Sequence, residues 1–507
     1  MVWHNGLREV RLSQMKIKVY MVLCILGLVL PGLAWGQAVP GKVKKPGPVR
    51  YQETWLSNDA GTPTDMAVDH LGNVHVTGFS GVTIKYNSNG HPLWKCNYFS
   101  GKDTIDIQLG VGLDFDGNVY VAGWSGTSVS FVGQWSLYYW DDWPIGLMSY
   151  NISLPGEDTC YTIIKYSPTG EQLWERHYKG EFPGYHIPTA MKVTPAGNVY
   201  VTGYSYGGGD IKNFDYLTVS YDTNGNLRWA ARYDGGVQDT DQATALAVDD
   251  YDQVYVTGRS WIGANNFDYL TIKYSAIGQK MWEARYDGEK HSYDRPTSLA
   301  VDSRLNVYVT GYSDGNEADI VTIKYDRNGQ QQWLNRYDGP GHYNDKAYDM
   351  IVDHNSGNVY VCGERSVGNP KIPPFPAAYA EFFVMKLNQK GNLEWQRRIL
   401  SDFEGSRATR MVMDRYGDIL VTGTQQFSQD RGRDWFTVKY SPQGAYTHID
   451  KYDGPGGPEE WKRDDFPAAI GADSQGNVYV TGVSHDTHGD SNFATMKYTR
   501  YENRLRY

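Results

Sequence analysis

Cysteine is scarce in this chain: its 507 residues include only four, and Cys24 lies in an apolar run near the N-terminus. The three that remain, Cys96, Cys160 and Cys362, form an odd and sparse set, which is not the pattern of a disulfide framework. We expect them to be small buried hydrophobic residues. One bridge between two of them stays open as the alternative, because an oxidising compartment would permit it.

Blocks of basic residues are also absent, and the formal net charge is −10. A nucleic-acid partner is therefore not expected, since phosphate backbones are bound by clustered lysines and arginines. The sequence lacks a nucleophile elbow, an H-E-x-x-H motif and a phosphate-binding glycine loop. We name no catalytic residue and expect a binding protein, with an enzyme as the open alternative.

Leucine is scarce as well, whereas valine and threonine are plentiful and the chain holds 40 tyrosines, 16 tryptophans and 56 glycines. Aromatic and β-branched residues favour pleated strands, and glycine favours tight turns. The composition therefore predicts an all-β fold.

The first 36 residues have the pattern of a secretory signal peptide. Two lysines precede an apolar run over 19–33, and a small-x-small cleavage site ends at Gly36. Met15 is an alternative start, because the residues before it fit no part of the pattern. The apolar run is short for a membrane span, so no transmembrane segment is expected after cleavage. These features predict export to the periplasm, the cell surface or the medium, with residues 37–48 as a flexible lead-in.

One heptapeptide recurs along the chain. Residues 197–203 read GNVYVTG, and exact or degenerate copies begin at residues 72, 117, 252, 305, 357, 417 and 476. Around each copy lie four short stretches with the apolar alternation of strands, separated by turn residues. Four strands at this spacing are typical of a β-propeller, with the heptapeptide as the second strand of each blade. Its first glycine would serve the tight turn, and its last would let the chain leave the strand.

Eight copies predict eight blades of four antiparallel strands, with seven blades as the alternative. The chain opens with PVRYQETW (48–55), which resembles a fourth strand without a blade, and it ends with strands one to three of a last blade. We expect the opening strand to complete that blade and leave no open sheet edge. The tail NRLRY (503–507) competes for the same place. Residues 49–507 would then be a single propeller domain, which we expect to be monomeric.

A glycine followed four residues later by tryptophan recurs in the turn and fourth strand of six blades. A tryptophan at a fixed place in each outer strand can pack between adjacent blades, because its ring buries a large apolar area. We assign this structural role to Trp94, Trp174, Trp229, Trp282, Trp333 and Trp395.

The succession of AVD, GNVYVTG, TIKY and G-x-x-x-W resembles the bacterial β-propeller repeat family SBBP, from about residue 50 to the end. That family is a scaffold largely without assigned activities, so the resemblance implies a fold and no reaction. Its name implies seven blades, against the eight second strands counted here. The G-x-x-x-W feature is also similar to the eight-bladed quinoprotein-like propellers. The adjacent cysteine pair of quinoprotein dehydrogenases is absent from the sequence, so no quinone cofactor is expected.

Long connections are confined to one face of the predicted ring. The links between strands one and two, and between strands three and four, are uniformly short. The links on the opposite face include the long segments 124–158, 364–380, 424–434 and 454–465. Variation in loop length on a rigid scaffold is how such folds acquire binding. We therefore place the functional site on the face with the long connections, called the long-loop face below; the other is the short-turn face.

The insertion over 124–158 is rich in aromatic residues and contains two adjacent aspartates. Aromatic rings beside carboxylates suit the recognition of sugars or of a protein surface. The alternative is a hairpin extension whose aromatic side chains pack on the ring. The candidate ligand-binding residues are Trp124, Trp135, Tyr138, Tyr139, Trp140, Asp141, Asp142 and Trp143.

A second candidate site is a series of aspartates where the chain enters the first strands, on the long-loop face. Carboxylates around the channel mouth are suitable ligands for Ca²⁺ or for a cationic group. The alternative is loop capping that repeats because the blade repeats. The series is Asp106, Asp241, Asp294, Asp345 and Asp465.

Together these features predict a secreted propeller that binds a protein or a glycan through its long-loop face. One alternative is a polysaccharide lyase or hydrolase that uses carboxylates at the channel mouth. A convergent pair of carboxyl groups with shifted pKa values in the channel would favour that enzyme. The other alternative is a purely structural envelope protein.

Overall fold

The computed structural model of the chain describes residues 49–79, 81–101, 104–128, 155–209, 213–236, 240–263, 266–314, 317–368, 378–399, 405–426, 432–455, 464–485, 487 and 491–502. These residues form 32 strands in eight four-stranded sheets. Within them there is no helix with the length and hydropathy needed to cross a membrane.

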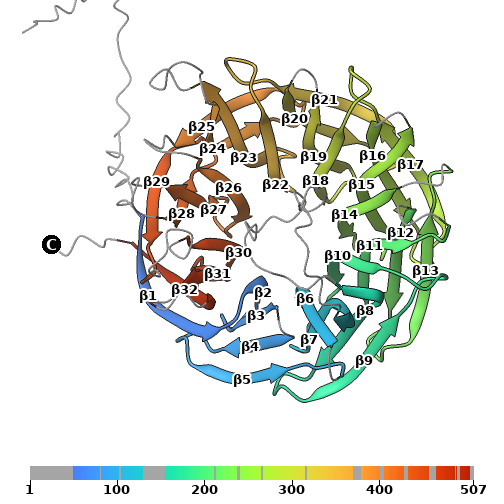
Figure 1. The fold of residues 1–507 in the computed structure, drawn as a ribbon. Coiled ribbons are helices and arrows are strands. Elements are labelled where there is room, and N and C mark those ends of the chain that lie inside the picture. Colours follow the sequence, from blue (N-terminus) through green and yellow to red (C-terminus); the bar gives the residue numbers. More distant parts are fainter. Residues whose placement is uncertain are drawn as a thin grey trace, which may run out of the picture. The chain divides into compact units, whose positions relative to one another are not determined.

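Each sheet is one blade, and in each the first strand lies innermost and the last strand outermost (Figure 1). The first blade contains β2 (Pro63–Val68), β3 (Val74–Gly78), β4 (Val82–Tyr86) and β5 (Pro92–Asn97), and the second contains β6 (Thr104–Leu113), β7 (Val119–Ser128), β8 (Pro155–Tyr166) and β9 (Gln172–Tyr178). The third blade contains β10 (His186–Val193), β11 (Val199–Tyr206), β12 (Phe214–Tyr221) and β13 (Leu227–Tyr233). The fourth contains β14 (Asp241–Val248), β15 (Val254–Gly263), β16 (Asn266–Tyr274) and β17 (Lys280–Tyr286).

The last four blades follow the same plan. They are β18 (Asp294–Val301), β19 (Val307–Asp314), β20 (Ala318–Tyr325) and β21 (Gln331–Tyr337); β22 (Asp345–Val352), β23 (Val359–Gly368), β24 (Ala378–Leu387) and β25 (Leu393–Ile399); β26 (Arg407–Met413), β27 (Ile419–Gln426), β28 (Arg433–Tyr440) and β29 (Tyr446–Tyr452); β30 (Phe466–Ala472), β31 (Val478–His485), β32 (Ser491–Glu502) and β1 (Val49–Ala60).

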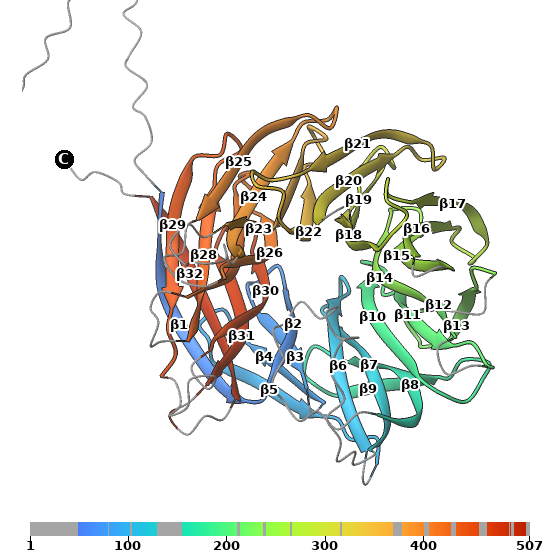
Figure 2. The same cartoon turned by 45° about the horizontal axis from the view of Figure 1, so that its top comes forward.

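The ring closes through its first strand. β1 pairs antiparallel with β32 from Val49 opposite Glu502 to Ala60 opposite Asn492. The blades follow one another around the axis in chain order, so that β30 contacts β2, as Figure 1 and Figure 2 show. The prediction of eight blades closed by an N-terminal strand is therefore confirmed, and seven blades is wrong. The competing segment 503–507 lies outside the described residues, as do residues 1–48.

The heptapeptide begins in the turn before the second strand. In the fifth blade, Oδ1 of Asp302 accepts the backbone N–H groups of Arg304 and Asn306 at 2.9 and 2.8 Å, and Oδ2 accepts the Tyr308 hydroxyl at 3.0 Å. Six of the eight blades have glycine in the positive-φ position of this turn, for example Gly197 with φ of 82°. The aspartate that ends the first strand and the tyrosine of the heptapeptide thus fix the turn together.

The last glycine of the heptapeptide has a different role from the one predicted, because the second strand continues past it. Gly258, for example, lies inside β15, opposite a bulge in β14 between Ala243 and Ala245. A Cβ atom on Gly258 would come within 2.0 Å of the Gln242 carbonyl oxygen. Glycine is therefore required by close approach of two backbones rather than by a strand end.

The bulged residue of the first strand connects neighbouring blades. At four blade junctions it is a threonine whose hydroxyl donates to a backbone carbonyl in the first strand of the next blade. Thr244, for example, donates to the carbonyl oxygen of Pro296 at 3.0 Å. The other three are Thr64 to Gln108 at 2.7 Å, Thr189 to Ala243 at 2.9 Å and Thr297 to Ala347 at 3.0 Å.

Candidate functional site

The connections on the two faces of the ring differ in length. On the short-turn face, each connection along the chain has five residues, except for six at 353–358. On the long-loop face, the connections reach 26 residues at 129–154, nine at 369–377 and 13 at 453–465. Only the long-loop face therefore varies from blade to blade.

The aromatic insertion is shorter than predicted, because the strands of the second blade extend into it. β7 runs to Ser128 and β8 begins at Pro155, and these two residues pair at its base. Trp124 lies within β7, where 2% of its surface is exposed and it packs with Ile107 and Ile187. Trp124 cannot stack on a ligand from this position, so its assignment to the binding site is wrong. The remaining candidates lie outside the described residues and stay a prediction: Trp135, Tyr138, Tyr139, Trp140, Asp141, Asp142 and Trp143.

The tryptophans of the fourth strands lie against the next blade. Trp229 donates its indole N–H to the carbonyl oxygen of Ala276 at 3.1 Å and lies over Gly278. A Cβ atom on Gly278, whose φ is 79°, would come within 2.7 Å of the indole ring. Each of the six tryptophans thus lies over the glycine at this turn position in the next blade; these glycines are Gly170, Gly225, Gly278, Gly329, Gly391 and Gly444. The corresponding indole donors, all at 3.0–3.1 Å, are Trp94, Trp174, Trp229, Trp282, Trp333 and Trp395.

Four of the five predicted metal-ligand aspartates lie in separate groups of three carboxylates, each at a different blade junction. One oxygen of each residue lies within 4.8 Å of one oxygen of each of the other two. The groups are Asp215, Asp234 and Asp241; Asp268, Asp287 and Asp294; Asp319, Asp338 and Asp345; and Asp434, Asp453 and Asp465. Among the described residues Asp106 belongs to no such group, because Phe99 follows Tyr98 where an aspartate follows the corresponding tyrosine of those four blades.

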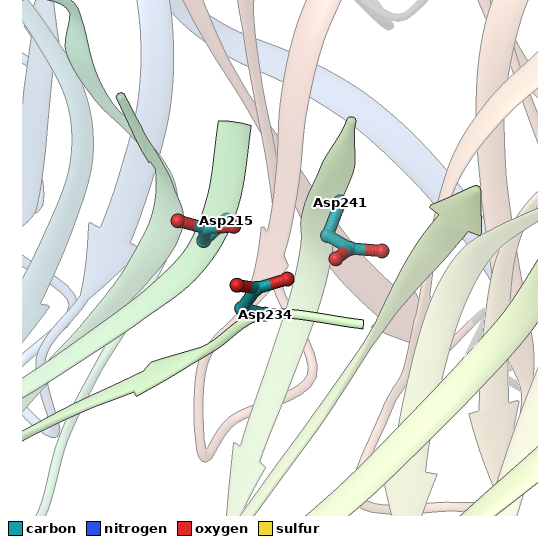
Figure 3. Close-up of side chains that lie close together, drawn as sticks. All are labelled: Asp215, Asp234 and Asp241. Atoms are coloured by element: carbon teal, nitrogen blue, oxygen red, sulfur yellow. The ribbon is translucent and has the colours of Figure 1, made fainter. Parts of the chain in front are cut away.

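Figure 3 shows one of these groups, in which Asp215, Asp234 and Asp241 direct their carboxylates toward one another. Asp215 is the second residue of the third strand of the third blade, Asp234 follows the fourth strand, and Asp241 begins the first strand of the fourth blade. All three ends lie on the long-loop face, because strand direction alternates within a blade. The group is therefore built from two blades and lies at their shared edge.

Burial raises the pKa of the first-strand aspartate in every group. The pKa rises to about 6 for Asp241 and Asp294, and to about 7 for Asp345 and Asp465, in each case mainly because burial disfavours the charged form. A second carboxylate of the same group raises it further, for example Asp215 beside Asp241. Backbone N–H groups, such as that of Gly235 on Asp241, act in the opposite direction.

One arginine or lysine accompanies each group, and in two groups a histidine contacts the middle aspartate as well: His291 lies 2.6 Å from Asp287, and His342 lies 2.6 Å from Asp338. Arg232 forms an ion pair with Asp215, and Arg336 contacts Asp319 at 2.6 Å. Arg285 lies 3.4 Å from Asp268, and Lys451 lies 2.6 Å from Asp434. With its carboxylates ionised, each group therefore has two negative charges in excess of its arginine or lysine.

A cavity of about 210 Å³ lies among the first strands near the axis, lined in part by Thr64, Asp65, Met191 and Arg410. Burial raises the pKa of Asp65, and Oδ2 of this residue accepts the Val111 backbone N–H at 3.0 Å. Burial likewise raises the pKa of Asp349, whose oxygens accept the backbone N–H groups of Met350 and Met411 at 2.8 and 3.0 Å. Both carboxylates thus fasten the first strand of the next blade.

The cysteines Cys96, Cys160 and Cys362 are free thiols, and the latter two are buried. Sγ of Cys160 lies 3.4 Å from Nδ1 of His177, whose Nε2 lies 2.8 Å from Oε1 of Glu175. The contact with Cys160 raises the pKa of His177 to about 9, with Glu175 adding to the effect and burial opposing it. Cys160 and His177 occupy the strand positions that Asp215 and Arg232 occupy in the next blade.

Two members of each carboxylate group were not predicted from the sequence. The available signal was spacing: Asp234 follows Asp215 by 19 residues, and Asp241 follows Asp234 by a further 7. The same intervals recur in the next two blades, and the aspartate in the middle always stands in a Tyr-Asp-Gly segment. Strand register was needed to show that these three positions meet.

Sheet topology and repeat pattern define this chain as an eight-bladed β-propeller repeat protein. Residues 285–317 and 462–490 match the family model of the beta-propeller repeat SBBP, and each stretch contains the first and second strands of a blade. The chain is therefore similar to the SBBP repeat at these two places, as the sequence resemblance predicted. No curated protein matches the chain.

Several solved propellers are similar to the chain in structure. The WD40 beta propeller domain of Doa1 is 10% identical with a TM-score of 0.39, over 89% of this chain and 97% of that one. The WD40 domain of SCAP from fission yeast is 9% identical with a TM-score of 0.45, over 89% and 98%. A eukaryotic initiation factor is 9% identical with a TM-score of 0.37, over 77% and 88%. At this level of similarity they carry no statement about function.

Proposed function

We propose that this protein is an exported scaffold that binds a protein or a glycan partner through its long-loop face. The observation that carries the proposal is the confinement of the long connections to that face, while turns of five residues, with one of six, close the opposite face. In a rigid ring with one variable face, the blades stabilise the fold and the loops bind the partner, so the loops can change without altering the blades.

The connection 129–154 is the strongest candidate for recognition. It contains seven aromatic residues and the Asp141-Asp142 pair, and it leaves the ring from the paired residues Ser128 and Pro155. Aromatic rings supply stacking area for sugars or hot-spot contacts for a protein, and carboxylates add hydrogen-bond acceptors.

The experiment is binding of the chain from Gln37 to a glycan array, compared with a variant in which 129–154 is replaced by Asn-Gly. Ser128 and Pro155 already pair across the strands, so a two-residue hairpin turn can close the gap without shifting their register. Loss of a wild-type glycan signal in this variant is the expected result. Retention of the whole signal would remove 129–154 from the binding site.

A matched control comes from the sixth blade. Gly368 pairs with Ala378, so 369–377 can be replaced by the same Asn-Gly turn. Wild-type binding should persist in this control if 129–154 dominates recognition. A wild-type chain that binds no glycan would contradict the glycan partner and leave a protein partner as the proposal.

Export is the second part of the proposal. It is supported by the charged start, the apolar run over 19–33 and the small-residue site ending at Gly36. Mass spectrometry of the mature chain should find Gln37 as its first residue. An intact chain that begins at Met1 or Met15 and stays in the cytosol would contradict export.

A carbohydrate-active enzyme remains the alternative. Its candidate carboxyl groups near the axis are Asp65 and Asp349, both with raised pKa values. Their oxygens already accept backbone N–H groups from the next blade, at 3.0 Å in each case. This engagement favours a role in fastening blades, and we therefore base the proposed function on binding.

A further inference from the structure

Beyond the binding of a partner, we propose that three of the four carboxylate groups at the blade junctions, those that contain Asp241, Asp294 and Asp465, are Ca²⁺ sites. Each takes one carboxylate from a third strand, one from the Tyr-Asp-Gly segment after the fourth strand, and one from the first strand of the next blade. A bound cation would therefore join two blades on the long-loop face.

In three of the four groups, hydrogen bonding engages Oδ2 of the first-strand aspartate and leaves its Oδ1 without a partner; these aspartates are Asp241, Asp294 and Asp465. In the remaining group both oxygens of Asp345 accept backbone N–H groups, Oδ2 from Gly339 and Oδ1 from Ser366 at 3.1 Å. In the group of Figure 3, Oδ2 of Asp241 accepts the Gly235 N–H at 2.7 Å, and Oδ2 of Asp215 contacts Arg232. Oδ1 of both aspartates has no hydrogen-bond partner, although only 0–1% of either residue is exposed. A buried carboxylate oxygen without a partner is unfavourable, and a coordinated cation removes that penalty.

The next junction repeats this arrangement and adds a neutral oxygen. Oδ1 of Asp268 and Oδ1 of Asp294 are again buried without a hydrogen-bond partner. Asn266 donates from Nδ2 to Oδ1 of Asp287 at 3.3 Å, while its own Oδ1 is buried and has no partner. An amide oxygen is a common Ca²⁺ ligand, and this one lies outside the carboxylate group itself.

Glycine makes room for the ligands. The Tyr-Asp-Gly segment contributes its aspartate to the group, and its glycine donates to the next first-strand aspartate. A Cβ atom on Gly288 would come within 2.8 Å of Oδ1 of Asp294, the oxygen without a hydrogen-bond partner. The close approach of backbone to carboxylate is therefore possible only with glycine.

Charge balance favours a divalent ion. Three ionised carboxylates and one arginine or lysine leave two negative charges in each of the three groups when His291, which lies 2.6 Å from Asp287, is neutral, and one divalent cation would neutralise them. Without the ion, the carboxylates repel one another at close range in a poorly solvated place.

The junction between the sixth and seventh blades gives an internal comparison. Glu381 occupies the third-strand position there, and it contacts two arginines, Arg365 at 2.7 Å and Arg398 at 3.2 Å. Among the described residues this junction contains no group of three carboxylates. At this junction, which lacks the carboxylate trio, the chain supplies a second positive charge of its own.

The ligand chemistry selects calcium. All ligands are oxygens, without histidine or cysteine in any group. Ca²⁺ accepts six to eight oxygens in flexible geometry, whereas Mg²⁺ demands a near-ideal octahedron. Asp234 is exposed, so water can complete the coordination. A site with three carboxylates, one of them already paired to arginine, should bind with a Kd on the order of 10⁻⁴–10⁻³ M, as in extracellular modules.

The test is equilibrium dialysis of the mature chain against about 10 mM CaCl₂, with thermal melts in Ca²⁺ and in EDTA. Wild-type protein should bind close to three equivalents and melt several degrees higher in Ca²⁺, with a smaller effect of Mg²⁺. Asp234→Asn should bind one equivalent fewer, and Asp234→Asn with Asp287→Asn two fewer. Asparagine keeps the Oδ1 that accepts the Gly236 N–H at 2.9 Å, so the loop should still form.

Asp250→Asn is the matched control, because Asp250 is an exposed aspartate in a turn of the short-turn face. It should bind as many equivalents as wild type. Absence of Ca²⁺ binding by the wild-type chain, with identical melts in Ca²⁺ and EDTA, would overturn the proposal. So would equal stoichiometry in wild type and in the two asparagine variants. The glycan result does not enter this test, so the two proposals fail separately.

Discussion

At the residue scale, one polar pair recurs inside the blades. The threonine of GNVYVTG hydrogen-bonds to a threonine of the third strand, as Thr257 does with Thr271 at 3.0 Å in the fourth blade. In two blades both partners are apolar or thiol residues instead: Ala122 lies opposite Ile163, and Cys362 lies opposite Val384. The two positions therefore change together, because a buried hydroxyl without its partner is unfavourable.

A single replacement in the pair should lower the free energy of unfolding by more than half of the loss caused by replacing both residues. Thr257→Val or Thr271→Val alone should lower the free energy of unfolding by about 1–2 kcal/mol, because the remaining buried hydroxyl loses its partner. The double variant should lose clearly less than the sum of the two. Urea unfolding of the four proteins provides the measurement. Additive losses would show that the pair is not coupled.

A second residue-scale prediction concerns the turn of the fifth blade. Leu305 has φ of 63° where six blades have glycine. Leu305→Gly should raise the free energy of unfolding by about 0.5–1 kcal/mol, since relief of left-handed strain exceeds the entropy that glycine loses. Asp252 has the same backbone conformation, with φ of 59°, but it contacts Asn198 at 2.8 Å and Arg228 at 3.2 Å. Asp252→Gly should therefore not stabilise, and a gain as large as that of Leu305→Gly would contradict this account.

At the scale of elements, blades are joined by tryptophan against glycine. Gly278→Ala should destabilise by more than 2 kcal/mol, because its Cβ would come within 2.7 Å of the Trp229 ring and its φ is 79°. Gly236→Ala is the control: its φ is 85°, but nothing lies within 4 Å of the added atom. The free energy of unfolding of the control variant should fall by about 1 kcal/mol. Equal losses in urea unfolding would show that the indole does not occupy this place.

The blade junctions should also make stability depend on pH. The pKa of Asp241 is raised to about 6 and that of Asp465 to about 7, above the 3.8 of an exposed aspartate. A raised carboxyl pKa means that the folded chain retains protons which the unfolded chain releases, so stability falls as pH rises from about 4 to about 7. The charged groups around each first-strand aspartate are Asp215, Asp234 and Arg285 for Asp241; Asp268, Asp287 and Asp314 for Asp294; Asp319, Asp338 and Arg365 for Asp345; and Asp434 and Asp453 for Asp465.

In EDTA, the melting temperature should therefore be higher at about pH 5.5 than at about pH 7.5. Ca²⁺ should raise the value at the higher pH and flatten the profile, because the cation replaces the protons. The melting temperatures can be measured by calorimetry at both pH values, with and without Ca²⁺. A melting temperature in EDTA that rises with pH over this range would contradict the raised pKa values.

Sequence predicted the elements better than the contacts between them. Alternating apolar residues and turn glycines were sufficient for the strands, and the position of Trp229 in its strand implied contact with the next blade. Trp124 was misplaced because a long strand and a loop rich in aromatics look alike without register. The bulged Thr244 and the carboxylate partner Asp215 escaped prediction, since their contacts cross blades and depend on the turn of the ring.

At the scale of the whole molecule, the ring separates a constant face from a variable one. The pairing of β1 with β32 closes the ring, so no blade edge is left for another chain along this seam. Five- and six-residue turns close the short-turn face, and the connections that differ in length emerge on the other. The central claim is therefore that partners are met on the long-loop face.

The most direct test of that claim is to mask one face at a time with a polymer attached to cysteine, in a Cys96→Ser background. Lys290→Cys places the polymer in an exposed connection of the long-loop face, and Ile277→Cys places it at an exposed turn of the short-turn face of the same blade. Binding of the partner should be lost with the polymer at position 290 and kept with the polymer at 277. Loss at 277 with full binding at 290 would contradict the claim.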